Sequence, residues 1–279
     1  MFGLLEFTLL IAAGSFLAGL LGSLTGLGGG VIIVPLLTLV FHVDIRYAIG
    51  ASLVSVIATS SGAASAYLKE GFSNIRVGMF LEVATTMGAL CGAFLAARIP
   101  TAAIAIVFGV VLLYSAWTSI KPEAEVPIHE RTDLIAQRLR LDGTYPADGM
   151  VVVYHVHRVP LGFGLMYIAG TLSGLLGIGS GAVKVLAMDR AMSIPFKVST
   201  TTSNFMIGVT AAASAGIYLH RGYIDPGLAM PVMLGVLVGA LLGARILPGA
   251  KVGTLRMVFG VAIAAVAVEM IFKGLRGNI

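Results

Sequence analysis

A glycine-rich stretch that occurs twice is the feature that most constrains how this chain folds. Leu17–Gly30 (LAGLLGSLTGLGGG) is matched 151 residues later by Ile168–Gly181 (IAGTLSGLLGIGSG). The same offset, without a gap, also pairs Arg46 with Lys197, Ser52 with Ser203, Tyr67-Leu68 with Tyr218-Leu219, and Phe108-Gly109 with Phe259-Gly260. This agreement indicates an internal duplication, and duplicated halves in a membrane protein are typical of transporters.

Composition indicates a membrane protein with many helices. Of the 279 residues, 58% are hydrophobic and only 11% are charged, and the mean hydropathy is +0.99. Because a helix needs about 20 apolar residues to cross the roughly 30 Å hydrocarbon layer, we expect an all-α polytopic protein with roughly 8–10 helices in a lipid bilayer. The candidate windows are Leu9–Phe41, Tyr47–Leu68, Val77–Ala97, Thr101–Ile120, Leu161–Met188, Val198–Leu219, Gly227–Ala244 and Met257–Phe272.

The composition argues against several other classes of protein. Cys91 is the single cysteine, so the chain forms no intrachain disulfide and a cysteine-based metal site is not expected. The net charge of +5 lies at the edges of apolar runs, where Lys and Arg orient membrane helices, so no nucleic-acid partner is expected. The sequence lacks the His-x-x-x-His, paired-Asp and Gly-x-Ser-x-Gly patterns of intramembrane enzymes. We therefore expect neither an enzyme nor a bound metal or cofactor.

The first apolar run is too long for one membrane helix, since Leu9–Phe41 would extend about 50 Å at 1.5 Å per residue. Glycine permits positive φ and close backbone approach, so the run is expected to break at the glycine cluster, leaving Val31–Phe41 as a short helix whose N-terminus suits an anion. A substrate-lining role is therefore predicted for both clusters: Gly26, Gly28, Gly29, Gly30, Gly177, Gly179, Ser180 and Gly181. The alternative is that these glycines only allow close helix packing, which is the interpretation we favour for Gly88, Gly92, Gly239 and Gly243.

A basic residue followed by hydroxyl and amide groups can hold an oxyanion through charge and hydrogen bonds. In the second half this pattern comprises Lys197, Ser199, Thr200, Thr201, Thr202, Ser203 and Asn204. The first half offers Arg46 and Ser52 as secondary anion contacts. The alternative makes Arg46 and Lys197 topology anchors and the hydroxyls donors to their own helix backbone; for Arg46 it is preferred.

Two charges lie inside apolar runs, where each costs roughly 2.5–3.5 kcal/mol on insertion scales. Lys184 follows the second glycine cluster by three residues and is predicted to reach the same site; pairing with Asp189 is the structural alternative. Glu82 either carries a coupling proton or lies near the interface and meets Arg76.

The domain organisation follows from a change of composition between the halves. Residues 1–120 form the first transmembrane repeat, residues 121–160 an aqueous charged linker, and residues 161–279 the second repeat. Alternation in Met150–Arg158 after the turn at Asp142-Gly143 favours a short β-ribbon with His155 and His157 on one face. Two histidines alone are a weak metal signal, and a regulatory or structural insert is expected.

Two topologies fit the duplication. If each glycine cluster only kinks a helix, each repeat has four spans and the halves are parallel. If each cluster turns the chain back, each repeat has five elements and the halves are inverted, with the linker cytoplasmic and both termini external by the positive-inside rule. In that case one side carries Lys69, Arg76, the linker, Arg190, Lys197, Arg245 and Lys251, and the other mainly Arg46, Arg98, Arg221, Lys273 and Arg276. We prefer the inverted arrangement.

Four segments resemble a known family: the glycine-rich pair Leu24–Gly30 and Leu175–Gly181, the stretch Lys197–Asn204, and Gly239–Arg245. Together they resemble the sulfite exporter TauE/SafE family, also described as the toluene sulfonate uptake permease family, over nearly the whole chain except the linker. The resemblance implies an inner-membrane carrier for small sulfur-containing anions such as sulfite, sulfoacetate or other organosulfonates. Ser180, where the first repeat has Gly29, and the long charged linker depart from a plain family member.

The sequence thus predicts a secondary transporter of a small sulfur-containing anion that works by alternating access, driven by a proton, another ion or the substrate gradient. A homodimer is a further expectation. The main alternative is an anion channel or uncoupled facilitator, which would use the same backbone amides and charges. A sensor with the linker as its working domain is a third hypothesis.

Overall fold

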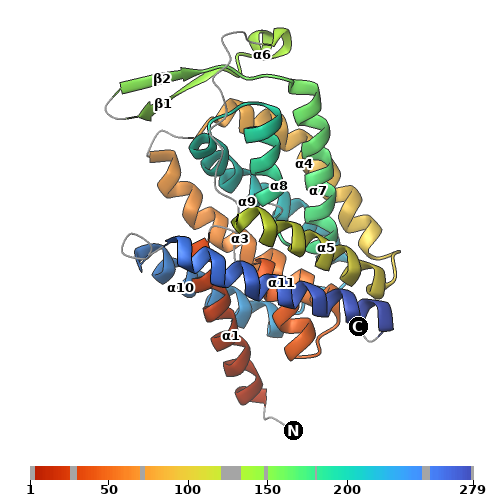
Figure 1. Cartoon of the computed structure of the whole chain (residues 1–279). Coiled ribbons are helices and arrows are strands. Elements are labelled where there is room, and N and C mark those ends of the chain that lie inside the picture. The colour runs from red at the N-terminus through yellow and green to blue at the C-terminus, as the bar shows by residue number, and fades with distance from the viewer. Residues whose placement is uncertain are drawn as a thin grey trace.

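The computed structural model describes residues 4–25, 30–69, 73–120, 133–147, 150–179, 181–246 and 252–277. Within these ranges the chain is nearly all helical, which confirms the expected class (Figure 1). Its elements in order are α1 (Leu4–Thr25), α2 (Gly30–Pro35), the π-helix η1 (Leu36–Val40), α3 (Ile45–Lys69), α4 (Ile75–Ala96), α5 (Thr101–Ile120), α6 (Leu134–Leu139), β1 (Gly143–Ala147), β2 (Met150–Tyr154), α7 (Val159–Leu176), α8 (Gly181–Leu186), the π-helix η2 (Ala187–Ala191), α9 (Phe196–His220), α10 (Pro226–Ile246) and α11 (Val252–Arg276).

The elements of the two halves begin and end at corresponding positions. Adding 151 to the bounds of α2, η1 and α3 yields those of α8, η2 and α9 without adjustment. Details of the connections recur as well: each π-helix is followed two residues later by a residue at positive φ, His42 (55°) after η1 and Ser193 (57°) after η2. The order of the helices is therefore the same in both halves, and the bounds of these three elements recur.

The chain reverses direction after each long first helix. A Cβ atom added to Gly14 in α1 would lie 3.0 Å from Leu36 Cδ2 in η1, whereas one straight helix would separate these positions by about 33 Å. In the second half the His157 amide, just before α7, donates to the Met192 carbonyl after η2 at 3.0 Å. The chain therefore reverses direction between α1 and α2 and between α7 and α8, and neither pair forms one continuous kinked helix.

Glycines set the closest helix contacts and reveal helix directions. A Cβ on Gly88 in α4 would overlap the Tyr167 carbonyl of α7, and one on Gly239 in α10 would overlap the Phe16 carbonyl of α1. Four residues further, Gly92 meets Thr171, so α4 and α7 run parallel. These contacts agree with the packing role predicted for such glycines.

The last helices of the two halves, α5 and α11, pack against each other and run in opposite directions. Gly109 of α5 lies against Ala267 and Ile271 of α11, while Gly274, further along α11, lies against Ala102 near the start of α5. Residues later in α5 therefore contact residues earlier in α11. Hence α5 and α11, which hold corresponding places in their halves, are antiparallel.

Three described helical segments are long and apolar enough to cross a membrane: Ile75–Ala96, Val159–Leu176 and Pro226–Gly243. Shorter apolar segments within the described residues are Glu6–Gly22, Gly30–Val40, Ile45–Ser61 and Thr101–Trp117. The structure thus supports a multi-pass membrane protein.

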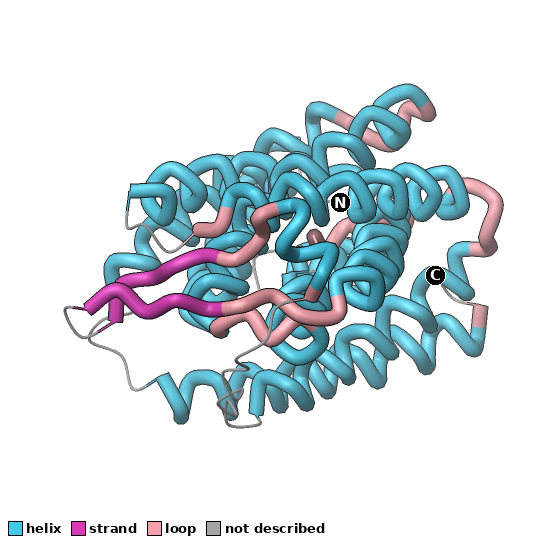
Figure 2. The backbone as a smooth tube through the Cα atoms, turned by 90° about the horizontal axis from the view of Figure 1, so that it is seen from above, coloured by secondary structure: helices cyan, strands magenta, loops and turns pink. Residues whose placement is uncertain are grey.

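The described residues between the halves, called here the inter-repeat unit, comprise α6 and the hairpin of β1 and β2. Strands β1 and β2 pair antiparallel, with Gly143 opposite Tyr154 and Ala147 opposite Met150. Figure 1 shows this hairpin and α6 at the upper end of the helical body, with the N-terminus at the opposite end. Seen from above in Figure 2, the hairpin projects sideways past the helices.

Candidate functional site

The glycine-rich segments of the two halves come into contact inside the helical body. Ser52 of α3 donates a hydrogen bond from Oγ to the Gly177 carbonyl at 2.8 Å. A Cβ on Gly30 would lie 2.9 Å from that same hydroxyl and 3.2 Å from the Gly177 carbonyl oxygen. Gly177 and Gly179 have φ of 68° and 70°, in the left-handed region that favours glycine. The second cluster thus turns directly against the start of α2.

Lys184 follows Gly177 by seven residues, in α8, and its side chain is fully buried. Its Nζ donates to the Thr210 Oγ1 of α9 at 2.6 Å. The nearby Asp189 carboxylate, the structural alternative for Lys184, lies 3.7 Å from Arg190 Nε. An ammonium group has three donors, and in the described part of the chain one of them is used by Thr210.

Glu82 approaches the same hydroxyl from α4. Its Oε1 accepts hydrogen bonds from Thr210 Oγ1 at 2.7 Å and from Thr86 Oγ1 at 3.1 Å. The residue is only 8% exposed, and its Oε2 has no hydrogen-bond partner among the described residues. One threonine hydroxyl therefore contacts both buried charges. Arg76, the alternative partner of Glu82, instead donates to the Arg140 carbonyl at 3.5 Å.

Thr210 was not among the predicted site residues. It lies six residues beyond the row Lys197–Asn204, and the sequence signal that points to it is its place on the same hydroxyl-rich helix. Its Oγ1 also lies 2.9 Å from the Met206 carbonyl, an ordinary contact for a threonine inside a helix.

Most of the predicted hydroxyl row serves local structure. Thr200 and Thr201 donate to carbonyls within α9, as the alternative interpretation expected. Ser199 donates to the Ile194 carbonyl just before the helix, and Thr202 Oγ1 accepts from the Asn74 amide at 3.0 Å. Ser203 faces the glycine contact, donating to the Gly181 carbonyl at 3.4 Å.

The polar ends of the row differ in exposure. Lys197 is exposed in the first turn of α9, and Asn204 is half-buried. Neither is placed beside the Lys184 ammonium by a described contact. Gly26, Gly28, Gly29 and Ser180 lie outside the described residues.

Arg46 lies at the far end of α4. Its guanidinium donates to the carbonyls of Ala96 and Ile99, at 3.3 and 2.9 Å. Since Ala96 follows Glu82 by 14 positions along α4, the two sites are about 21 Å apart along the helix axis. The structure does not bring Arg46 to the buried charges and uses it to satisfy the carboxyl-terminal carbonyls of α4.

The inter-repeat unit is attached close to the start of α4 and α9. Asn74 caps α4 by accepting from the Val77 amide, and its Nδ2 donates to the Leu141 carbonyl and to the Tyr154 hydroxyl, at 2.9 and 2.7 Å. Its backbone amide donates to Thr202 of α9. Asn74 therefore links the hairpin to both helices that supply Glu82 and Thr210.

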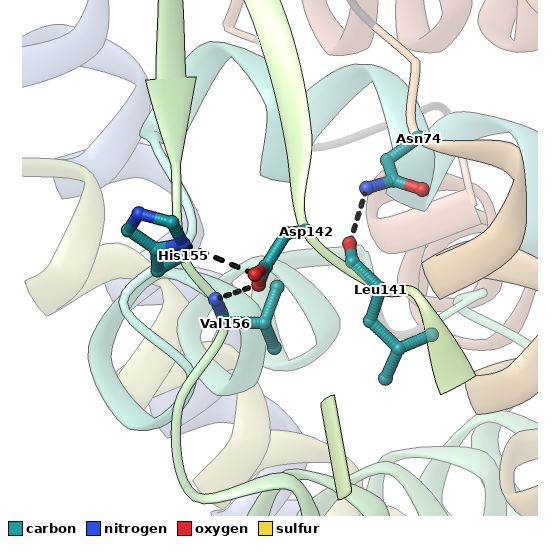
Figure 3. A network of polar contacts seen from close by, with 5 residues as sticks. All are labelled: Asn74, Leu141, Asp142, His155 and Val156. Atoms are coloured by element: carbon teal, nitrogen blue, oxygen red, sulfur yellow. Dashed lines mark hydrogen bonds and ion pairs between the residues drawn. The ribbon is translucent and has the colours of Figure 1, made fainter. Parts of the chain in front are cut away.

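A second set of bonds closes the base of the hairpin. Figure 3 shows Asp142 between the His155 ring and the Val156 amide, which approach its carboxylate to 3.0 and 2.8 Å, beside the Asn74 contact to Leu141. His155 is thus engaged by Asp142. Among the residues that the structure describes, no group of three or more His, Cys, Asp or Glu side chains is placed to hold a metal ion.

Comparisons with known proteins agree with this architecture. The chain is 27% identical to the Probable membrane transporter protein YunE of Bacillus subtilis, covering 97% of this chain and 99% of the relative. It is 27% identical to YdhB of the same organism, covering 85% and 89%, and 28% identical to a Methanocaldococcus jannaschii protein also described as a probable membrane transporter, covering 87% of each. No solved structure matches the chain. The model of the family described as Sulfite exporter TauE/SafE matches residues 11–270, so the chain belongs to the TauE/SafE family of membrane transporters.

Proposed function

We propose that this protein is a secondary transporter that carries a small sulfur-containing anion, such as sulfite, sulfoacetate or another organosulfonate, across the inner membrane by alternating access. The observation that carries the proposal is the fully buried Lys184 in α8, the short helix that begins at the end of the second glycine-rich segment. Burying a cation in a membrane protein costs free energy, and binding of an anionic substrate would offset part of that cost. Its spare N–H groups suit the oxygens of a sulfonate or sulfite.

The arrangement of helices supports inverted repeats. The bounds of α2, η1 and α3 recur 151 residues later in α8, η2 and α9, and the corresponding helices α5 and α11 run antiparallel. A two-fold axis in the membrane plane relates elements in this way, whereas parallel repeats would leave corresponding helices parallel. The reversal of the chain at each glycine cluster adds the fifth element that an inverted repeat requires.

The positions of the arginines support the expected orientation. At one end of α4, Arg76 contacts Arg140 of the inter-repeat unit. At the other end, Arg46 and Arg221 both donate to carbonyls in the last turns of α4 or just beyond it. These three arginines divide between the two ends of α4 as the inverted topology predicts, which supports a cytoplasmic position for the hairpin.

Ligand-induced stabilisation of purified protein tests the proposed site. Thermal unfolding in detergent is measured with sulfite, thiosulfate, sulfate, sulfoacetate and taurine, for the unmodified protein and for Lys184→Met. At least one sulfur oxyanion is expected to raise the unfolding temperature, and this shift is expected to vanish in Lys184→Met, which keeps the unbranched stem and removes the charge.

Lys273→Met is the matched control, because Lys273 lies on α11 beside Glu269 and far along the chain from the glycine clusters. It should retain the shift. A correctly folded Lys184→Met protein with an unchanged anion shift would refute the site. In proteoliposomes, saturable uptake with counterflow exchange supports a carrier, and flux without saturation or exchange supports the channel alternative.

A further inference from the structure

The carboxylate of Glu82 has one oxygen with nothing to bind. Oε1 accepts two hydroxyl hydrogen bonds, whereas Oε2 is buried without a partner among the described residues. A buried charged oxygen that lacks a partner costs several kcal/mol, on the order of the values for isolated polar groups. The neighbouring hydroxyls fix the side chain and leave Oε2 as the atom at which a ligand or a proton can bind.

A proton fits this position better than a metal cation. The carboxylate shares Thr210 with the Lys184 ammonium, which would repel a metal ion at short range. A metal ion also needs several oxygen ligands, and the described residues contain no cluster of acidic or histidine side chains around Glu82. A proton needs only the one free oxygen.

Other titratable groups lie far from Glu82 on each helix that packs against it. On α7, Tyr167 contacts Cys91, which follows Glu82 by nine residues, about 13 Å along α4. On α9, Lys197 and His220 lie about 20 and 15 Å from Thr210 along the helix. On α4 itself, Arg76 faces Arg140. Of the charged groups on these elements and on α8, Lys184 is the one brought to Glu82.

We propose that Glu82 binds the coupling proton, and that its protonation releases Lys184 to bind the transported anion. This inference rests on the proposed function. While Glu82 is ionised, its charge offsets that of Lys184, and an arriving anion meets a site with no net charge. When Oε2 gains a proton, Lys184 is left as the unbalanced charge and the new O–H becomes an additional donor. Proton and anion therefore enter together, which is symport.

The stoichiometry follows from the difference between the halves. The positions that correspond to Lys184 and Glu82 are occupied by Ile33 and Met233, whereas Thr210 corresponds to Thr59. The charged pair therefore occurs once per chain. One proton accompanies one anion at this site in each cycle.

Anion affinity measured as a function of pH tests the coupling. Thiosulfate or sulfate serves as the probe, because neither takes up a proton between about pH 5.5 and pH 8.5, so a pH dependence of binding in this range belongs to the protein. Because the proposed binding takes up one proton per anion, the anion affinity of the unmodified protein is expected to fall as the pH rises, by at most about tenfold per pH unit. In weakly buffered solution, binding should withdraw one proton per anion.

Glu82→Gln mimics the protonated carboxyl and is expected to bind the anion with pH-independent affinity and to exchange anion without moving protons. Glu269→Gln, on the exposed face of α11, is the matched control and should keep the pH dependence. The coupling proposal fails if anion binding by Glu82→Gln depends strongly on pH. It also fails if the unmodified protein binds the anion independently of pH and without proton uptake. Either result leaves the proposed transport function standing. Should the unmodified protein bind no anion at any pH, the proposed function itself falls.

Discussion

At the scale of single residues, Thr210 is the side chain on which the buried charges depend. Its oxygen accepts from the Lys184 ammonium at 2.6 Å and lies 2.7 Å from Glu82 Oε1. A hydroxyl can accept and donate at once, so one atom satisfies both charges while keeping them apart. A direct ion pair would leave Lys184 less available to a substrate anion.

Replacing Thr210 by valine should therefore destabilise the protein. The isosteric substitution leaves two buried charged groups without this partner, at a cost of about 1–3 kcal/mol. Thr59→Val is the matched control, because Thr59 holds the corresponding position and, among the described residues, donates to carbonyls of its own helix. Unfolding of both variants is compared in detergent; equal stability of the two would contradict the bridging role of Thr210.

Tyr154 provides a pH-dependent residue outside the membrane-spanning helices. Burial raises the pKa of Tyr154 to about 12, the hydrogen bond from Asn74 opposes this rise, and the charge of Asp142 adds to it. The ordinary value is about 10. Because folding favours the neutral phenol, its contribution to stability is complete below about pH 10 and declines as the pH rises to about 12.

We therefore expect the hairpin to detach more readily above about pH 10. Protease cleavage of the inter-repeat unit is measured against pH for the unmodified protein and for Tyr154→Phe. The alkaline increase should be smaller in Tyr154→Phe, and Tyr145→Phe, on the partner strand, is the control. An identical alkaline increase in the unmodified protein and Tyr154→Phe would show that Tyr154 does not control docking.

At the scale of elements, close helix pairs hold the two halves together. Helix α1 of the first half packs on α10 of the second, and α4 of the first packs on α7 of the second, in each case with glycines against backbone carbonyls. Lipid removes the hydrophobic drive for helix association, so close backbone contact and dispersion take its place. Each of these pairs therefore joins a helix of the first half to a helix of the second half.

Gly88→Ala should loosen the α4–α7 pair. Its new methyl group would overlap the Tyr167 carbonyl, and the strain is expected to cost roughly 1–3 kcal/mol. Gly164→Ala on α7 meets nothing within 4 Å and serves as the control. Thermal unfolding in detergent compares the two variants; the expectation fails if Gly88→Ala unfolds no earlier than Gly164→Ala.

At the scale of the whole molecule, the proposed inverted topology separates the two ends of the repeats. Figure 1 shows the hairpin at the upper end of the body and both chain termini in its lower half. Five elements per repeat, an odd number, carry the chain from one side of the membrane to the other before the inter-repeat unit begins. Four spans per repeat would return it to the starting side.

Cysteine labelling distinguishes these topologies. In a Cys91→Ala background, Leu275→Cys near the C-terminus should react with a membrane-impermeant maleimide added to spheroplasts, because both termini are expected outside. Thr144→Cys, exposed in β1, should react only after permeabilisation. Labelling of both cysteines from the same side would contradict the inverted arrangement and favour four spans per repeat.

Much of the element order could be predicted from the sequence. Apolar runs identify membrane helices because lipid imposes a minimum length, and the over-long first run together with its glycines located the break between α1 and α2. The duplicated sequence and the family resemblance follow from residue order alone, which requires no knowledge of which helix faces meet. Lys184 and Glu82 were singled out because a charge inside an apolar run is costly wherever the helix packs.

Only the tertiary structure decided which groups those charges meet. Glu82 and Thr210 are 128 residues apart and approach because α4 packs on α9, a choice that helical periodicity alone does not reveal. The same holds for the hydroxyl row, in which Thr200 and Thr201 bond to their own helix while Ser203 reaches Gly181. A threonine in a helix can satisfy its hydroxyl locally or across an interface, and the neighbour that packing supplies determines which bond forms.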